Sequence, residues 1–316
     1  MIKFYIKKDR KLHELEEPIP GAWVNITPPF SIEELETYSA TYKIPLDFLK
    51  DSLDVDERSR YEVEDDAKLI LVNSAILNTS KIENEPVYIT APIGIITTPD
   101  NIFTICAFES SVLKMFINGK IKAFNTDVEE AHFVLQILEQ NVYRFLSCLK
   151  KLNLRRHQIE QELLDSSRNK ELRQLLSIEK SLVYFVNSLS SNELLKMKMK
   201  RSDFLKIRAN EELTDLFEDI IIDNSQALEM SNIYTNILNG TMDAYGSIIS
   251  NNLNNVMKRL TVITIVLMVP TLFASFYGMN LDLPFSKSPY SFFYIFATSI
   301  LVSIFLIAYF KKNRLL

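Results

Sequence analysis

A stripe of small and weakly polar side chains recurs along the segment that leads into the most apolar part of the chain. Serine and threonine at such positions can let two helices approach and hydrogen-bond across them, and a lone asparagine can set the register. The same side chains can also line a path for a hydrated cation, so helix packing and a pore lining are both open. Members of the stripe follow one another at intervals of three or four residues, the spacing of one helix face: Asp243, Ser247, Ser250, Asn254, Met257, Thr261, Thr264, Met268, Thr271 and Ser275.

Signatures of enzymatic chemistry are missing from the sequence. It contains no Gly-x-x-x-x-Gly-Lys-Ser/Thr loop for ATP. The three histidines, His13, His132 and His157, do not have metal-ligand spacing, and we interpret them as surface or core residues. Two cysteines, Cys106 and Cys148, cannot staple a chain of 316 residues and are expected to be apolar packing. We therefore predict no catalytic residues and no enzyme.

Charge is distributed unevenly along the chain. The last sixty residues hold one acid, Asp282, and six bases, and the totals of 40 acids and 35 bases leave 39 acids and 29 bases before residue 257. A net charge of about −10 on this long polar segment argues against a nucleic-acid partner, which would require a basic body. The profile is typical of a polar body joined to a short membrane anchor.

Two apolar runs near the C-terminus are long enough to cross a membrane. Residues 260–281 are 22 consecutive uncharged residues, and residues 288–310 are 23 more. About 20 residues suffice to cross ~30 Å of hydrocarbon. Only residues 282–287 separate the runs, too few for a domain, so we predict a tight hairpin of two transmembrane helices in contact with lipid.

The flanking charges predict the orientation of this hairpin. Lys258 and Arg259 precede the first run, and Lys311, Lys312 and Arg314 follow the second. Because cytoplasmic flanks carry the excess of Lys and Arg, both chain ends are expected in the cytoplasm. The beginning of the sequence does not have the apolar stretch of a signal peptide. We predict a multi-pass protein of the cytoplasmic (inner) membrane.

Residues 1–125 have the pattern of a cytoplasmic α/β domain. Ser31 follows two prolines and precedes Glu33 and Glu34, which indicates an N-cap with acids in the first helical turn. A second short helix is expected at 47–53. Runs rich in β-branched and aromatic residues predict strands at 2–6, 23–26, 69–77, 87–97 and 102–108.

Residues 126–256 change to the pattern of long helices. Thr126 and Glu129 form a predicted capping box. We expect a helical hairpin near 165–169 and a helix break at the polar residues 190–192. From residue 210 nothing stops the helix before the first span, and ~65 residues at 1.5 Å each would make a stalk of ~100 Å. The remaining predicted parts are a stalk helix at about 210–259, a first span at 257–281, an outside loop at 282–287, a second span at 288–310 and a basic tail at 311–316.

The outer end of the first span resembles a known family. The span closes with Gly278-Met279-Asn280, directly after a tyrosine, and a short loop and a lysine-rich tail follow. This is similar to the CorA-type divalent-cation channels, whose defining motif is Gly-Met-Asn at this place. The resemblance covers essentially the whole chain, since it continues through Pro270-Thr-Leu-Phe-Ala-Ser, Asn254-Asn-Val-Met-Lys and Trp23-Val-Asn-Ile-Thr-Pro-Pro.

This resemblance implies a funnel-shaped homopentamer with an α+β cytoplasmic domain, a long helical stalk and two C-terminal transmembrane helices, the first lining a pore. Gly278, Met279 and Asn280 would form the selectivity filter, where Gly278 permits a sharp exit from the helix. The Asn280 amides would hydrogen-bond the waters of Mg²⁺, which gives them up reluctantly. The implied pore-facing positions are Asp243, Asn254, Met257, Leu260, Thr264, Met268 and Thr271, with Met257 and Leu260 as a gate that closes by dewetting.

The resemblance also implies a regulatory site for Mg²⁺ between cytoplasmic subunits. Asp51 and Asp219 match its two sides. Carboxylates from different subunits repel one another until a cation neutralises them. High cytosolic Mg²⁺ would therefore hold the funnel closed, and depletion would loosen it.

The sequence departs from the family pattern in the outer loop, where Asp282 is the one acid. Met279 favours Mg²⁺ and Co²⁺ over Zn²⁺. We predict a Mg²⁺ and Co²⁺ channel that admits cations down the membrane potential and is gated by cytosolic Mg²⁺. One alternative is a transporter of Zn²⁺ or another transition metal on the same scaffold. Others are a membrane-anchored coiled-coil protein with a structural or signalling role, and an enzyme tethered to the membrane.

Overall fold

The computed structural model describes residues 2–8, 11–80, 82, 84–121, 130–165, 169–279 and 290–313. The chain divides into two compact units, Met1–Gly240 and Thr241–Leu316. We describe each unit by itself. The predicted domain boundary between residues 125 and 126 rests on the sequence pattern and stays a prediction.

A seven-stranded sheet forms the centre of the first unit. Its strand order is β2-β1-β3-β7-β6-β5-β4. β3 and β7 pair in parallel, and the other neighbours pair antiparallel. The strands are β1 (Ile2–Lys8), β2 (Lys11–Leu15), β3 (Trp23–Ile26), β4 (Arg60–Glu64), β5 (Ala67–Leu77), β6 (Tyr88–Thr97) and β7 (Ile102–Cys106).

The five predicted strands are confirmed, and the two strands that the sequence analysis missed are the two edges of the sheet. β2 has the sequence KLHEL and β4 has RYEVE. Charged side chains are typical of edge strands, because they discourage pairing with further chains. The same charges hide such strands from a search for apolar runs.

Both faces of the sheet are covered. Leu69 and Leu71 of β5 belong to a core shared with α1 (Ile32–Tyr42) and α2 (Leu46–Asp51). Ile70 and Val72 point to the other face, where the core includes residues of α3 (Ser111–Ile117) and of the long helices. This alternation is the two-residue period of a strand. It explains why the central strands carry mostly apolar residues on both faces.

The predicted start of the first helix is confirmed. The Ser31 hydroxyl accepts a hydrogen bond from the Glu34 backbone N–H at 3.2 Å, and the Glu34 carboxylate accepts one from the Ser31 N–H at 2.9 Å. This reciprocal pair is a capping box. The second short helix, expected at 47–53, is α2, whereas α3 was not predicted.

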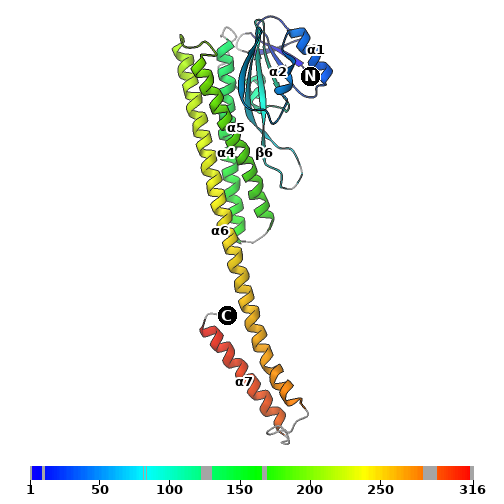
Figure 1. Cartoon of the computed structure of the whole chain (residues 1–316), viewed down its shortest axis with the longest axis vertical. Helices are drawn as coiled ribbons and strands as arrows, with labels where there is room; N and C mark the ends of the chain where they lie inside the picture. The colour runs from blue at the N-terminus through cyan, green and yellow to red at the C-terminus, as the bar shows by residue number, and fades with distance from the viewer. Residues whose placement is uncertain are drawn as a thin grey trace. The chain divides into compact units, whose positions relative to one another are not determined.

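Three long helices follow: α4 (Glu130–Asp165), α5 (Asn169–Ser202) and α6 (Glu211–Tyr277). α4, α5 and the first part of α6 run side by side along the sheet (Figure 1). The predicted capping box at 126–129 and residues 166–168 of the predicted turn lie outside the described residues.

The predicted helix break at residues 190–192 is wrong, because α5 is continuous there. The Asn192 amide accepts a hydrogen bond from the Asn73 N–H at 3.0 Å and donates one to the Asn73 carbonyl at 2.8 Å. The Ser191 hydroxyl accepts one from the Ser59 N–H at 3.0 Å. Polar side chains that could have ended the helix instead bind the sheet, so the backbone stays helical.

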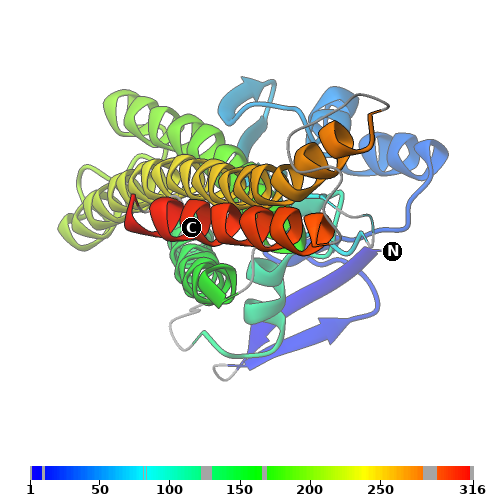
Figure 2. The same cartoon turned by 90° about the horizontal axis from the view of Figure 1, so that it is seen from below.

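The second unit holds the end of α6 and α7 (Ser291–Lys312), which lie beside each other (Figure 2). α6 is a single helix of 67 residues, as the stalk prediction requires. Both helices have an apolar stretch long enough to cross a membrane, and only 6% and 11% of these stretches are buried within the chain. A core helix of a soluble protein would be mostly buried, so the exposed apolar surface fits two membrane spans.

Candidate functional site

One side of α6 packs against α7. Val262 is 5% exposed, and Val266, Val269 and Phe273 are half-buried, at helical intervals of three and four. On α7, Ser299 and Ser303 are buried. These positions define the face of α6 that is turned towards its neighbour in the same chain.

Five of the predicted pore-facing residues lie on the opposite side of α6. At about 100° per residue, Met257, Leu260, Thr264, Met268 and Thr271 point about 180° away from the Val262 face, whereas Asp243 and Asn254 point about 100° away from it. All seven predicted residues are exposed in the single chain, and within the second unit their face is not the one used by α7. They are Asp243, Asn254, Met257, Leu260, Thr264, Met268 and Thr271.

Threonine hydroxyls on this face donate to their own helix. Thr264 Oγ1 donates to the Leu260 carbonyl at 2.8 Å, and Thr271 Oγ1 donates to the Leu267 carbonyl at 3.1 Å. With its proton directed back to the helix, each hydroxyl presents oxygen lone pairs outward. Oxygen acceptors are what Mg²⁺ or its bound waters require. The face therefore offers weak oxygen ligands without a fixed charge in the membrane.

The end of α6 explains the glycine of the predicted filter. Gly278 N–H donates to the Ala274 carbonyl at 2.9 Å, and Met279 N–H donates to the Phe276 carbonyl at 3.3 Å. A Cβ on Gly278 would lie 3.1 Å from the Ala274 oxygen, so a larger residue would crowd this last turn. Met279 is half exposed. Asn280, Asp282 and the predicted loop at 282–287 lie outside the described residues.

The two predicted regulatory aspartates are not brought together within one chain. Asp51 ends α2, where its Oδ2 lies 2.6 Å from Nη2 of Arg60. Asp219 lies on an exposed face of α6. Among the described residues, no group of three or more His, Cys, Asp or Glu side chains could hold a metal ion. The structure of a single chain thus provides two separate carboxylates, and a shared site would need a second copy.

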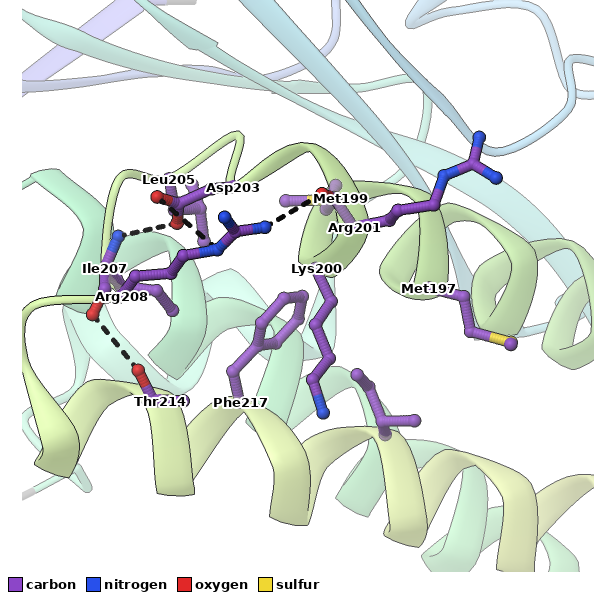
Figure 3. A pocket seen from close by; sticks show the side chains of 11 residues that line it. Met197, Met199, Lys200, Arg201, Asp203, Leu205, Ile207, Arg208, Thr214 and Phe217 are labelled. Carbon is purple, nitrogen blue, oxygen red and sulfur yellow. Dashed lines mark hydrogen bonds and ion pairs between the residues drawn. The ribbon is translucent and has the colours of Figure 1, made fainter.

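A cavity of about 570 Å³ lies at the connection between α5 and α6 and was not predicted (Figure 3). Lys200 Nζ at its wall binds Glu218 at 2.6 Å. Arg208 donates to the Arg201 carbonyl at 3.1 Å and approaches Asp203 at 4.0 Å. Three basic side chains and one acidic side chain line the cavity, so its charge opposes binding of a divalent cation.

A buried lysine between α5 and α6 was also missed. Lys196 is 0% exposed, and its Nζ donates to Oδ1 of Asn224 at 2.7 Å. Burial lowers the pKa of Lys196 to about 7, against an opposing effect of Glu193. Its spacing could have revealed it, because Lys196 lies seven residues after Leu189 and three before Met199 on the buried face of α5, whereas Lys198 is exposed.

Comparison with known proteins identifies the family. The family model for CorA-like Mg²⁺ transporter proteins matches residues 21–312. A cobalt/magnesium transport protein CorA from Methanocaldococcus jannaschii is 26% identical over 295 residues, which are 92% of this chain and 90% of the relative. One from Thermotoga maritima is 22% identical over 301 residues, 92% of this chain and 82% of the relative.

A solved structure has the same fold along the whole chain. The complete structure of the CorA magnesium transporter from Methanocaldococcus jannaschii matches with a TM-score of 0.81 at 24% identity, over 99% of this chain and 98% of that chain. Together with the family match over most of the sequence, this agrees with the resemblance carried by Gly278-Met279-Asn280. The chain belongs to the CorA-like Mg²⁺ transporter family.

Proposed function

We propose that the chain is the subunit of a Mg²⁺ channel that also conducts Co²⁺, and that five copies surround one pore. The observation that carries the proposal is the exposed stripe on α6, on the side that α7 does not cover. Membership of a family of ion transporters supports transport and argues against an enzyme. The number five rests on resemblance to the family alone.

The stripe has the chemistry of a pore and needs several copies to make one. A single helix cannot enclose water, but a ring of α6 helices with α7 outside would turn Thr264, Met268 and Thr271 inward. Hydroxyl oxygens can hydrogen-bond the waters of a hydrated cation without replacing them. Met257 and Leu260 add an apolar constriction nearer the cytoplasm, which would close by dewetting.

Gly278, Met279 and Asn280 are proposed as the outer filter. Because Gly278 has no Cβ to crowd the Ala274 oxygen, the helix can end at Tyr277 without a steric clash. A ring of Asn280 amides would then bind the hydration shell of the ion at the mouth. Neutral amides suit a cation that keeps its waters, because they can hydrogen-bond the hydration shell without replacing it.

The energy for uptake is proposed to come from the membrane potential. The sequence has no phosphate-binding loop for ATP. A divalent cation that enters through 100 mV, inside negative, gains about 4.6 kcal/mol, which corresponds to more than a thousandfold accumulation. Passive entry therefore suffices, provided that the protein lies in the cytoplasmic membrane with both ends inside, as the flanking lysines and arginines favour.

Cytosolic Mg²⁺ is proposed to regulate the channel by binding between Asp51 of one subunit and Asp219 of the next. Both carboxylates are accessible in the single chain. Arg60 already neutralises part of the charge of Asp51, so Mg²⁺ has to share this carboxylate with a guanidinium. A site of this kind would release Mg²⁺ more readily than one built from unpaired carboxylates, which suits a sensor.

The experiment that tests the channel is Mg²⁺ influx into proteoliposomes under an inside-negative potential. Wild type is compared with Asn280→Ala and with Asn255→Ala, a matched asparagine that lies on the far side of α6 from the stripe. We expect potential-driven Mg²⁺ influx that Asn280→Ala abolishes and Asn255→Ala retains. Influx of Zn²⁺ without Mg²⁺ would favour the transition-metal alternative, and no flux of either ion would refute a channel.

A further inference from the structure

Pro270 leaves one backbone carbonyl of α6 without its usual partner. In an α-helix the carbonyl of residue 266 accepts a hydrogen bond from the N–H of residue 270. Residue 270 is proline, which lies inside the helix and has no N–H. An unpaired carbonyl is costly in hydrocarbon, where water cannot replace the missing donor.

A side chain from the other membrane helix reaches this carbonyl. Ser303 Oγ of α7 donates to the Val266 carbonyl oxygen at 3.5 Å. Ser303 is 9% exposed, and Val266 lies on the face of α6 that packs against α7. The contact joins positions 37 residues apart in the sequence. α7 therefore supplies, from its own side chain, the donor that the proline removed.

Other hydroxyls on α7 follow a different pattern. Ser299 Oγ donates to the Phe296 carbonyl at 2.9 Å, and Thr298 Oγ1 donates to the Tyr294 carbonyl at 2.7 Å. Both bonds stay within α7, the usual arrangement for such residues in a helix. Ser299 is buried like Ser303 and lies one turn away from it. It is thus a natural control for the loss of a buried hydroxyl.

The location of the bond connects it to the filter. Proline kinks a helix near its own position, because it removes a hydrogen bond and its ring crowds the carbonyl four residues earlier. About two turns of α6 follow Pro270 before the helix ends at Tyr277, directly ahead of Gly278 and Met279. A contact that fixes the backbone at Val266 therefore also fixes the direction of the helix segment that follows Pro270 and leads to Gly278 and Met279.

We propose that Ser303 is a positioning residue for ion conduction: its hydroxyl caps the Val266 carbonyl left free by Pro270 and so holds the outer end of the pore helix in the direction that brings the filter residues together. The inference rests on the proposed channel function. A hydrogen bond between membrane helices changes an equilibrium by about threefold on average and by up to about twentyfold. The long distance places this bond at the lower end of that range.

A double-mutant cycle between Ser303 and Pro270 tests the proposal. Full-length variants are reconstituted in proteoliposomes, and the initial influx of Mg²⁺ and of Ca²⁺ is measured per oligomer. Ser303→Ala should lower Mg²⁺ influx by about threefold and also lower the ratio of Mg²⁺ to Ca²⁺ influx. A loss of correctly folded protein would reduce both fluxes together and leave the ratio unchanged. Ser303→Thr, which keeps the hydroxyl, and Ser299→Ala should both behave as wild type.

The decisive comparison is made in the Pro270→Ala background. Alanine restores the backbone N–H, so the Val266 carbonyl no longer needs Ser303, and adding Ser303→Ala should change neither the influx nor the ratio. Equal losses from Ser303→Ala in both backgrounds, or no loss in either, would overturn the proposal. The same cycle is run on the melting midpoint of the purified oligomer in nanodiscs, where Ser303→Ala should lower the midpoint only when Pro270 is present.

The two readouts separate this inference from the channel proposal. If wild type carries no Mg²⁺, the proposed function is wrong. The proposed role of Ser303 in conduction is then wrong too, even if the melting cycle detects the hydrogen bond. If wild type carries Mg²⁺ and the melting cycle finds no coupling between positions 270 and 303, the inference alone is wrong. If Pro270→Ala abolishes influx, the inference is tested by the melting cycle and by the ratio of Mg²⁺ to Ca²⁺ influx of Ser303→Ala with Pro270 present.

Discussion

Replacing Lys196 by methionine is predicted to change how the stability of the first unit depends on pH. Lys196 and Asn224 are both 0% exposed, and they join α5 to the first part of α6. Asn224 in turn donates to the Leu189 carbonyl at 3.0 Å. A charged ammonium at this place has a neutral amide as its hydrogen-bond acceptor. The charge is therefore poorly compensated, which is why burial lowers the pKa of Lys196 to about 7.

The sign of the effect follows from the direction of this pKa change. The ordinary pKa of lysine is 10.5, and the folded value is about 7. Between these values the unfolded chain holds a proton that the folded chain has released, so the free energy of unfolding rises with pH across this window. Below about pH 7 the folded chain carries the buried charge at its full cost of about 5 kcal/mol relative to the neutral amine. By about pH 10.5 this cost has disappeared.

Methionine has a similar length and no charge, so it removes the pH-dependent cost. It also removes the donor to Asn224, and an unpaired buried amide oxygen costs about 1–3 kcal/mol. The variant Lys196→Met should therefore be more stable than wild type by about 2–4 kcal/mol at pH 6. Near pH 10, where about 1 kcal/mol of the charge cost remains in wild type, it should be less stable by about 0–2 kcal/mol. The two stability curves are expected to cross.

Urea unfolding of the detergent-solubilised full chain at pH 6, 7, 8, 9 and 10 measures this difference. Trp23 is the one tryptophan of the sequence, and it is buried in the core that also contains Leu195 and Met199. Its fluorescence therefore reports unfolding of the first unit. The matched control is Lys198→Met, because Lys198 is exposed on the same helix. The control should stay within about 0.5 kcal/mol of wild type at every pH.

A constant difference between Lys196→Met and wild type over the whole pH range would refute the reasoning. It would mean that Lys196 has the same charge in the folded and unfolded chains. A Lys196→Met variant that is less stable than wild type at pH 6 would refute it as well. Methionine would then fill the site poorly, and the buried charge of wild type would cost little free energy.

Two further predictions concern regulation and packing. Asp219→Asn should raise the internal Mg²⁺ concentration that half-inhibits influx, because the site loses one carboxylate. Arg60→Gln should lower this concentration, because Asp51 then keeps its full charge for the metal. Unchanged inhibition in both variants would refute the proposed regulatory site. Asn192→Ala should lower the free energy of unfolding by about 1–3 kcal/mol, since the buried N–H of Asn73 loses its shorter hydrogen bond. The same urea titration measures this loss, and no change would contradict it.

The sequence was most informative where burial is complete. The central strands are covered on both faces, so both of their faces carry mostly apolar residues, and the sequence predicts these strands as well as the helix start at Ser31. Edge strands and the continuity of α5 were not predictable in the same way. Asn192 looks like a helix stop until its partner, the backbone of Asn73, is known, and that partner lies 119 residues away.

The candidate site, like the fold, could be predicted from the sequence only in part. Spacing alone predicts that Thr264, Met268 and Thr271 share one face of a helix, because the period of a helix is fixed. Spacing does not say whether that face meets α7 or a second copy. The register of α7 on α6 decides this, since Val262 and Val266 take the contact with α7 and leave the opposite face free.

Pro270 makes the limit of sequence reasoning specific. From the sequence one can deduce that a proline within this helix leaves the carbonyl of Val266 without a donor. α7 offers several hydroxyls that could compensate, among them Ser299 and Ser303, and the sequence treats them alike. The side-by-side packing of the two helices selects Ser303 and leaves Ser299 bonded to its own helix. Two serines one turn apart therefore differ: Ser299 bonds within its own helix, and Ser303 has a proposed role in positioning the filter.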